Sequence, residues 1–300
     1  MQGAVVRAMP WVFVLIWSTG FVVARLGMPH SPPFSFLSVR FALSALCFFV
    51  WIALARAAWP VGRAQWGHLA VTGMLMQAGY LGGVWSAVKA GIGAGTVALL
   101  VGLQPVLTAL WVTATASRSA AGGAANGVSL RQWLGLLLGL GGLVLVVWPK
   151  MGTGEVTPGN LTMAFVALLG ITIGTLYQKR HVAPCDVRTA SAIQMLAALL
   201  ISVPFALLEP EAMVWHPNLT AAMAWSVGVL TLGGSSLLYL LIQRGEATAV
   251  TSLLYLVPPC TAVMAWLLFG EAFTSLMIFG MALTVAGVAI VVRDRSAAGA

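Results

Sequence analysis

The sequence predicts an all-α, polytopic membrane protein of ten transmembrane helices, arranged as two inverted-topology repeats of five helices. Three observations support this fold class: extreme hydrophobicity, a series of apolar segments of membrane-spanning length, and an internal duplication. Of the 300 residues, 60% are hydrophobic and only 7% are charged, and the mean hydropathy is +0.97. Because soluble domains carry about 25% charged residues, this chain has too little polar surface to face water on all sides.

Ten apolar segments are each long enough to cross the roughly 30 Å hydrocarbon core of a bilayer as a helix. Charged residues, prolines and glycine-rich loops separate them, and the alternating polarity that a membrane β-barrel needs is absent. The predicted spans are 9–27, 34–56, 66–88, 93–116, 131–148, 159–179, 188–208, 219–242, 247–268 and 274–292.

Each span ends where its apolar run is interrupted. The first span follows Arg7 and could imitate a signal peptide, but it is long and has no convincing small-residue cleavage site, so we expect it to be retained. The longest loop, 117–130, is small and flexible in composition, and no room remains for a soluble domain. The later interruptions, in chain order, are Pro32-Pro33, Arg56, Lys89, the loop 117–130, Pro149-Lys150, Pro158, Lys179-Arg180, Glu209-Pro210, Arg244, Gly270-Glu271 and Arg293.

The distribution of lysine and arginine predicts the orientation in a bacterial-type inner membrane. With both termini in the cytoplasm, 11 of the 15 basic residues lie inside and 4 outside, as the positive-inside rule requires. The net charge of +8 is then a consequence of topology, and no nucleic-acid partner is expected. The inner residues are Arg7, Arg56, Arg63, Arg118, Arg131, Lys179, Arg180, Arg188, Arg244, Arg293 and Arg295, and the outer ones are Arg25, Arg40, Lys89 and Lys150.

Cysteines and histidines form no recognisable site. The three cysteines, Cys47, Cys185 and Cys260, lack metal-ligand spacing and imply no disulfide framework. The four histidines lie near span ends or in loops, without a spacing such as HExxH. No metal or other cofactor is expected.

The chain contains an internal duplication. An offset of 153 residues places Val97–Ala109 on Val250–Ala262 with six of thirteen positions identical, and the informative match is Pro105 with Pro258. The next spans correspond at an offset of 145. Their matched glycines are Gly135 with Gly280 and Gly142 with Gly287.

The first spans of the two halves end at Arg25 and Lys179, which differ by 154 residues, so the repeats are residues 1–152 and 153–300. Each half holds five spans, an odd number, and the second half must therefore enter the membrane from the opposite side. Inverted repeats place a substrate site near the bilayer midplane, between the halves and beside interrupted helices, and they permit two mirror-related states. A duplication that only builds a stable scaffold is the alternative to transport.

Two stretches resemble the EamA family of the drug/metabolite transporter superfamily: Leu15–Phe41 (LIWSTGFVVARLGMPHSPPFSFLSVRF) and Ser252–Thr274 (SLLYLVPPCTAVMAWLLFGEAFT). The resemblance covers nearly the whole chain and is greatest to the YddG-type exporters of aromatic and other amino acids. It implies amino-acid export through a central cavity lined by spans 1, 3, 4, 8 and 9. The first half departs from the family pattern, because the loop 117–130 replaces the glycine-glutamate turn at Gly270-Glu271. We infer that this turn is not part of a symmetrical mechanism.

Pro105 and Pro258 are expected to kink or open their helices, because proline lacks a backbone N–H and clashes with the carbonyl four residues earlier. Carbonyls freed in this way are tolerated in lipid only where protein or a watery cavity covers them. Both prolines should therefore face the space between the halves and could act in gating, with a passive packing kink as the alternative. Pro259 has Val106 as its counterpart and is less informative.

Polar and aromatic residues inside the spans are the candidate substrate-binding residues. An amide or hydroxyl in hydrocarbon needs a partner, so it turns toward a cavity or a neighbouring helix, and for any single residue interhelical bonding is the alternative. Together, these hydroxyl, amide and aromatic side chains would form a pocket that suits a zwitterion with an apolar or aromatic side chain. The candidates are Trp17, Ser18, Gln77, Tyr80, Gln104, Ser235, Tyr239 and Tyr255.

The 7 acidic residues lie at span ends, in loops or in the C-terminal tail. Proton antiporters commonly use a buried carboxylate, so we expect a facilitator or exchanger without one. No basic residue is expected at mid-depth, and Arg25, Arg40 and Lys89 should gather at the outer end, where they either guide carboxylates into the cavity or anchor the helices at the interface. Glu271 should lie near the start of the last span, where the helix dipole favours an acid.

Two other functions remain open. The cargo could be a drug, a polyamine or a nucleotide-type metabolite, and its export could be coupled to protons. A cationic cargo would need a carboxylate in the pocket, and a phosphate would need a basic residue. An intramembrane enzyme would need paired aspartates, a serine with histidine or lysine, or a metal cluster at mid-depth, and no such set is visible. The expected partners are a small-molecule substrate and the lipid bilayer, and a monomer is sufficient.

Overall fold

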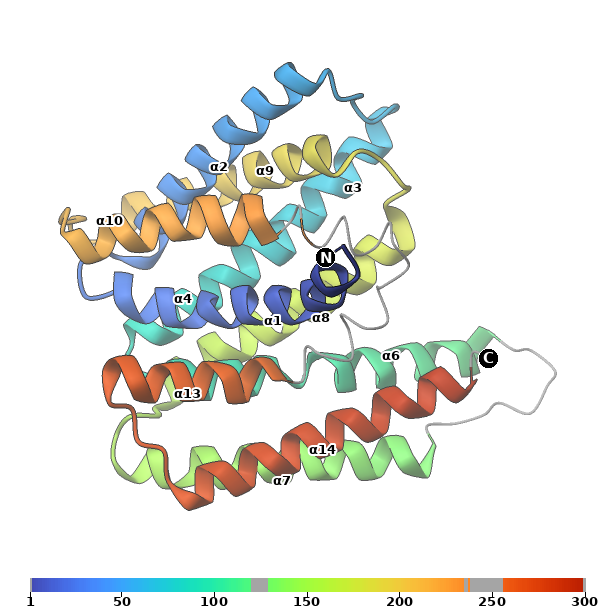
Figure 1. Cartoon of the computed structure of the whole chain (residues 1–300), viewed down its shortest axis with the longest axis vertical. Helices are drawn as coiled ribbons and strands as arrows, with labels where there is room; N and C mark the ends of the chain where they lie inside the picture. The colour runs from blue at the N-terminus through green and yellow to red at the C-terminus, as the bar shows by residue number, and fades with distance from the viewer. Residues whose placement is uncertain (1, 120–128, 235–236, 238–255, 299–300) are drawn as a thin grey trace.

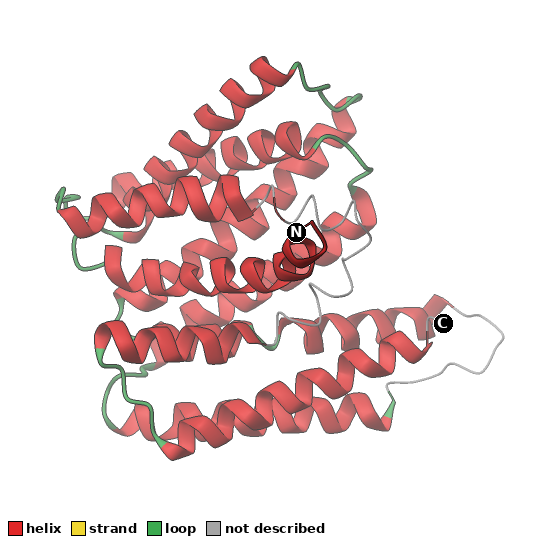
Figure 2. Cartoon of the chain, viewed as in Figure 1, coloured by secondary structure: helices red, strands yellow, loops and turns green. Residues whose placement is uncertain are grey.

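The computed structural model describes residues 2–119, 129–234, 237 and 256–298. All regular structure in these residues is helical (Figure 2). The helices run roughly side by side, with their connecting loops at two opposite ends of the molecule (Figure 1). They account for the ten predicted spans in two halves, which confirms the predicted fold class; the eighth span is described mainly in its first part and the ninth only in its second part.

Several spans are built from more than one helix. In the first half the elements are α1 (Gln2–Gly27), α2 (Pro33–Ala55), α3 (Arg63–Gly73) with the π-helical η1 (Met74–Gly79) and α4 (Tyr80–Lys89), α5 (Ala94–Val101) with α6 (Gln104–Ser119), and α7 (Leu130–Gly152). In the second half they are α8 (Pro158–His181), α9 (Val187–Leu208), α10 (Pro217–Ala224) with the π-helical η2 (Trp225–Gly233), α13 (Val257–Phe269) and α14 (Ser275–Ala298).

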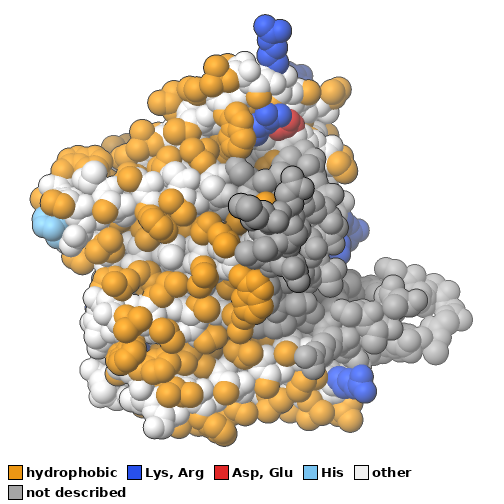
Figure 3. Space-filling view, in the orientation of Figure 1, with side chains coloured by type: hydrophobic (Ala, Val, Ile, Leu, Met, Phe, Trp, Pro, Cys, Tyr) orange, Lys and Arg blue, Asp and Glu red, His pale blue; other side chains and the backbone are white. Residues whose placement is uncertain are grey.

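Length and composition suit a bilayer. Five described segments are long and apolar enough to cross a membrane, and three shorter apolar helices accompany them. Apolar side chains are spread over the described part of the face shown in Figure 3, and the lysine and arginine side chains visible there lie toward the side where the C-terminus is found in Figure 1. The five segments are Pro33–Ala55, Ala94–Trp111, Leu130–Gly152, Pro158–His181 and Val187–Leu208.

The first three spans of the two halves match at a constant offset of 154 residues. α1 ends at Gly27 where α8 ends at His181, and α2 begins at Pro33 where α9 begins at Val187. Spans 3 and 8 both contain a π-helical segment, one ending at Gly79 and the other at Gly233, again 154 residues apart. Because π-helical turns are rare and occur often at functional sites, their presence in both halves indicates that spans 3 and 8 contribute to a functional site.

Equivalent helices pack against each other, as a pseudo-twofold axis requires: α2 on α9, α5 on α13, and α7 on α14. The contact between α7 and α14 depends on four glycines in reciprocal pairs. A Cβ atom on Gly142 would overlap the carbonyl oxygen of Gly280, and one on Gly287 would overlap the carbonyl oxygen of Gly135. Small residues of this kind let helix backbones approach closely in membranes.

The interrupted helices of the two halves also meet. α5 ends at Val101 and α6 begins at Gln104, so span 4 is broken immediately before Pro105. Pro258 is buried in the first turn of α13, and its Cγ atom lies 2.9 Å from where a Cβ atom on Gly102 would stand. The break in one half is therefore packed against the proline of the other.

Candidate functional site

A cavity of about 660 Å³ lies between the two halves. Its described lining comes from spans 1, 2 and 3 of the first half and from spans 6, 7 and 8 of the second, which are three pairs of equivalent helices. The described parts of spans 4 and 9, which the family resemblance places in the lining, contribute no lining residue, and the first part of span 9 lies outside the described residues. The volume and the mainly apolar wall are typical of small-molecule sites.

The cavity opens at one end of the molecule. At the end of the molecule that contains the α8–α9 loop, the cavity is lined by Lys179 of α8 and by Ala183 and Pro184 of the loop. All three residues are exposed. The equivalent loop at the other end, 28–32 between α1 and α2, is mostly buried, and Ser31 within it is only 2% exposed. Two loops related by the repeat thus stand in opposite states, one open and one closed.

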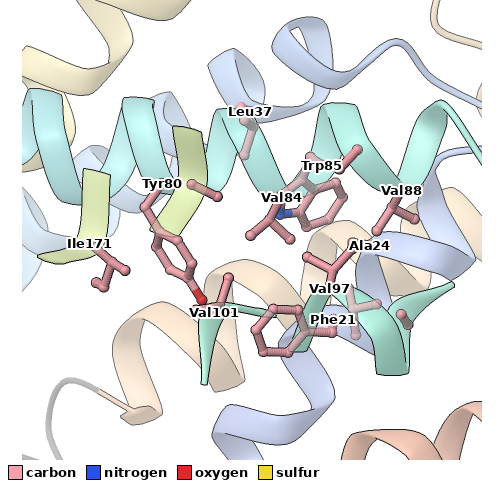
Figure 4. Close-up of a cluster of buried hydrophobic side chains, with 14 of the residues drawn as sticks. Phe21, Ala24, Leu37, Tyr80, Val84, Trp85, Val88, Val97, Val101 and Ile171 are labelled. Atoms are coloured by element: carbon pink, nitrogen blue, oxygen red, sulfur yellow. The ribbon is translucent and has the colours of Figure 1, made fainter. Parts of the chain in front are cut away.

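Aromatic packing closes the other end. The ring of Trp85 stacks on Phe36 with centroids 4.3 Å apart, and both side chains are fully buried. Figure 4 shows Trp85 and Val84 of α4 facing Phe21 and Ala24 of α1. Large rigid side chains in close contact leave no path for solute on this side.

Carboxylates of the second half hold helix N-termini of the first half at the closed end. Glu209 accepts the backbone N–H groups of Phe34 and Ser35, each at 2.8 Å, in the first turn of α2. Glu271 accepts the N–H of Ala94 at 3.0 Å, in the first turn of α5. Both acids therefore lie where the positive end of a helix dipole favours them. The expectation that Glu271 serves the start of the last span is wrong, because its helix partner is α5.

Two of the three basic residues expected together at the outer end, Arg25 and Lys89, lie at this closed end, each beside an acid. Arg25 Nε is 3.9 Å from Glu271 Oε1. Lys89 forms an ion pair with Glu211 and donates to the carbonyl oxygen of Met28 at 3.2 Å. In this conformation each of these two cations pairs with an acid of the second half.

Three of the candidate substrate-binding residues line the cavity: Trp17, Gln77 and Tyr80. Ser18 is turned to its own helix, where its hydroxyl donates to the Val14 carbonyl at 2.7 Å. Gln104 does not line the cavity itself, but its side-chain amide donates a hydrogen bond of 3.1 Å to Thr175, which does line the cavity. Pro105 and Pro258 are absent from the lining. Ser235, Tyr239 and Tyr255 lie outside the described residues.

The cavity wall also contains a residue that the sequence reasoning misplaced. Arg40 lines the cavity and is the only charged side chain among the buried residues that the structure describes, so a basic residue expected at the outer end of the molecule forms part of the cavity wall. A sequence signal existed, since the offset of 154 that aligns the spans also pairs Arg40 with Gln194, another lining residue. The same offset pairs Gln77 with Thr231 in the two π-helical segments, and both line the cavity.

Cys185 marks the open end of the cavity. Burial raises the pKa of the Cys185 thiol above its ordinary value, and nearby Asp186 acts in the same direction, while the Gln65 amide that donates to the sulfur opposes both. The thiol is therefore mainly protonated at neutral pH, and only the thiolate reacts with maleimides.

In a Cys47→Ser, Cys260→Ser background, we expect the rate of N-ethylmaleimide addition to Cys185 to increase roughly tenfold from pH 7 to 8 and to go on increasing above pH 8. Because the pKa is raised, the rate should not level off at or below the ordinary thiol pKa. Mass spectrometry of timed samples measures it, with the Cys185→Ser protein as the blank. A plateau reached below about pH 8.5 would contradict the environment described for this thiol.

Comparison with known proteins gives a consistent picture of fold and class. The sequence model of a family described as the EamA-like transporter family matches residues 9–148 and again residues 159–293. A solved crystal structure that is 20% identical in sequence superposes with a TM-score of 0.63, covering 95% of this chain and 96% of that one. At this identity the likeness concerns the fold alone.

Relatives of similar length carry transporter names. An "Uncharacterized transporter" of Archaeoglobus fulgidus is 24% identical over 92% of this chain and 93% of its own length. The "Uncharacterized inner membrane transporter YedA" of Escherichia coli K12 is 26% identical over 92% of this chain and 87% of its own length. A "Probable amino-acid metabolite efflux pump" of Salmonella typhimurium is 24% identical, covering 92% and 91% respectively.

Proposed function

Since this chain belongs to the EamA-like transporter family, we propose that it exports amino acids with apolar or aromatic side chains by alternating access through the cavity between its halves. As a multi-pass membrane protein of a transporter family, it acts on a small-molecule substrate in a membrane. The proposal goes further in naming the cargo, the direction and the mechanism. It treats the chain as a transporter without enzymatic activity, sufficient as a monomer and most like the YddG-type exporters.

The observation that carries the mechanism is the opposite state of two equivalent loops. Loop 182–186 lines the open end of the cavity, whereas most of loop 28–32 is buried at the closed end. In an inverted repeat, exchanging the conformations of the halves yields the mirror-related state, open at the other end. We take the units that exchange to be the predicted repeats, residues 1–152 and 153–300, and Pro105 and Pro258 to lie at the breaks where the helices bend.

The charge distribution supports the proposed orientation. With the termini in the cytoplasm of a bacterial-type cell, the open end with Lys179, Arg180 and Arg188 faces inward, as the positive-inside rule favours. The structure then represents a state that loads substrate from the cytoplasm, which suits export. No carboxylate stands among the described lining residues, which favours a facilitator or exchanger over a proton antiporter.

The lining also supports amino acids as cargo. Trp17, Phe21 and Tyr80 supply an aromatic wall, and Gln77 and Gln194 supply amide groups. Similarity to proteins named amino-acid metabolite efflux pumps points in the same direction. A cationic drug would find no carboxylate on the described wall, so it is the weaker alternative.

Counterflow in proteoliposomes tests the proposal. Vesicles loaded with unlabelled phenylalanine or leucine should accumulate the labelled amino acid, and an imposed pH gradient without a substrate gradient should drive no flux. Trp17→Ala should lower the exchange rate about tenfold through lost aromatic contact. Trp148→Ala, on the exposed surface of α7, should stay within about twofold of wild type. If no amino acid exchanges while a cationic drug does, the proposed function is wrong.

A further inference from the structure

Arg40 occupies an unusual place for a charged residue. It lies about 10 Å along α2 from Pro33, at 1.5 Å per helical residue, and so within the apolar part of the span. Its side chain is 6% exposed and forms part of the cavity wall. A charged side chain at this depth is costly unless it is paired or faces a watery cavity, and such residues commonly mark a substrate path.

The guanidinium group is only partly satisfied by the protein. Its Nη2 donates to the Thr231 hydroxyl at 3.3 Å, while that hydroxyl donates its own proton to the Ser226 carbonyl at 2.8 Å. Its Cζ stands 6.0 Å from the ring centroid of Trp85. The Nε atom is buried without a hydrogen-bond partner. Since a guanidinium carries five N–H donors and only one of them is bonded to Thr231, donors remain for a group inside the cavity.

No carboxylate in the described part of the chain pairs with Arg40. The ion pairs found there join other residues: Arg25 with Glu271, Lys89 with Glu211, Lys150 with Glu155, and Arg188 with Asp186. Glu209 is bound to the N-terminus of α2. Among the described residues the positive charge of Arg40 thus has no carboxylate to balance it, and it is available to an anionic solute in the cavity.

We propose that Arg40 binds the carboxylate of the transported molecule, so that the carboxylate is required for binding and the ammonium group of an amino acid is dispensable. The inference rests on the proposed function, since it names the chemical group by which the transporter selects its cargo. The planar fork of arginine matches a carboxylate with two parallel hydrogen bonds, which are stronger than bonds between neutral groups.

The remaining lining explains why the ammonium group matters less. The other polar groups of the described lining, among them Gln77, Gln194 and Thr231, are neutral, and no described lining residue is acidic. Lys179 adds a second positive charge at the open end. A cavity with this charge balance attracts anions and repels cations. Carboxylic acids without an amino group should therefore bind about as well as amino acids, and amines should bind poorly.

Three probes that share one aromatic ring test this in the wild-type protein. They are L-phenylalanine, 3-phenylpropanoate and 2-phenylethylamine, each measured by competition against labelled L-phenylalanine with purified protein in detergent. We expect 3-phenylpropanoate to compete within about threefold of L-phenylalanine, and the amine to be at least about thirtyfold weaker, because it cannot make the charge-assisted pair. An amine that competes as well as the acid would overturn the inference.

Substitutions of Arg40 provide the second test. Arg40→Gln should weaken binding of both carboxylates about thirtyfold and remove the preference over the amine, whereas Arg40→Lys, which keeps the charge without the fork, should lose less. Arg56→Gln is the control, because Arg56 is exposed at the end of the same helix and outside the cavity. Thermal stability in detergent identifies a variant that fails to fold, in which case Arg40→Lys and the wild-type probe series still decide.

The outcomes separate the inference from the proposed function. Folded Arg40→Gln protein that binds both carboxylates within about threefold of wild type contradicts the role of Arg40, while amino-acid counterflow by the wild type would still support transport. If wild-type vesicles exchange no amino acid but the protein binds 3-phenylpropanoate in an Arg40-dependent way, the proposed cargo is wrong and the carboxylate site stands. Equilibrium dialysis with labelled 3-phenylpropanoate measures this binding directly.

Discussion

Gly142→Val is expected to prevent folding or to lower the free energy of unfolding by about 3 kcal/mol or more, as overpacking against a rigid backbone does. The added side chain would meet the Gly280 carbonyl oxygen and the Thr284 side chain, and backbone on the facing helix cannot move aside cheaply. Size-exclusion chromatography after a temperature series in detergent measures the effect as a lower midpoint of thermal unfolding.

Gly141→Val is the matched control, because the neighbouring position on the same helix has nothing within 4 Å of an added Cβ atom. Both substitutions carry the same cost of helix propensity, so their difference isolates the contact between α7 and α14. Equal thermal midpoints for the two variants would show that these helices are not packed as described.

Glu271→Ala is expected to shift the protein from the state described here toward the state open at the opposite end. The substitution removes the carboxylate from the N-terminus of α5 and from the neighbourhood of Arg25, two contacts that join the halves at the closed end. The Glu271 side chain is only 10% exposed, so solvent screens its bond to the Ala94 N–H little, while the contact with the more exposed Arg25 contributes less. A loss of about 2 kcal/mol would change the ratio of the two states roughly thirtyfold.

Two cysteine positions report this shift. Native Cys185 lines the open end, and its equivalent at an offset of 154 is Ser31, which is buried at the closed end. In a Cys47→Ser, Cys260→Ser background, Glu271→Ala should slow maleimide labelling of Cys185. In the same background, with Cys185→Ser added, it should speed labelling of Ser31→Cys. The opposite changes at the two positions are the signature of a population shift, which general loosening of the fold would not produce.

Glu211→Ala provides the control for this experiment. Glu211 also joins the halves, through Lys89, but its side chain is 58% exposed. Exposed ion pairs contribute about 0.2–1 kcal/mol, so the labelling rates should change little. If Glu271→Ala leaves both reporters as they are in the parent protein, its carboxylate does not hold the closed end.

The span boundaries could be predicted from the sequence because bilayer thickness fixes helix length. α2 runs from Pro33 to Ala55, against a predicted 34–56. The match of Pro105 with Pro258 likewise located the break in span 4 and the start of α13. These features depend on local residue types and on the repeat, both of which are visible in one sequence.

The site was less predictable, for physical reasons that Arg40 and Glu271 illustrate. In helices this apolar, side-chain polarity does not distinguish a lipid-facing from a cavity-facing position, and an arginine a few turns into a span can snorkel outward as readily as point inward. Glu271 was assigned to the nearest helix along the chain. Its actual partner, Ala94, is 177 positions away, and a single sequence carries no record of that proximity.

The reciprocal glycine contacts between α7 and α14 have a consequence for how such a chain arises. Gly142 meets Gly280 as Gly287 meets Gly135, so each half offers its partner the same surface that the partner offers in return. A surface of this kind is self-complementary. A five-span ancestor inserted in both orientations could have assembled as an antiparallel homodimer through it, and fusion of two copies would then have fixed one subunit in each orientation and left each free to diverge.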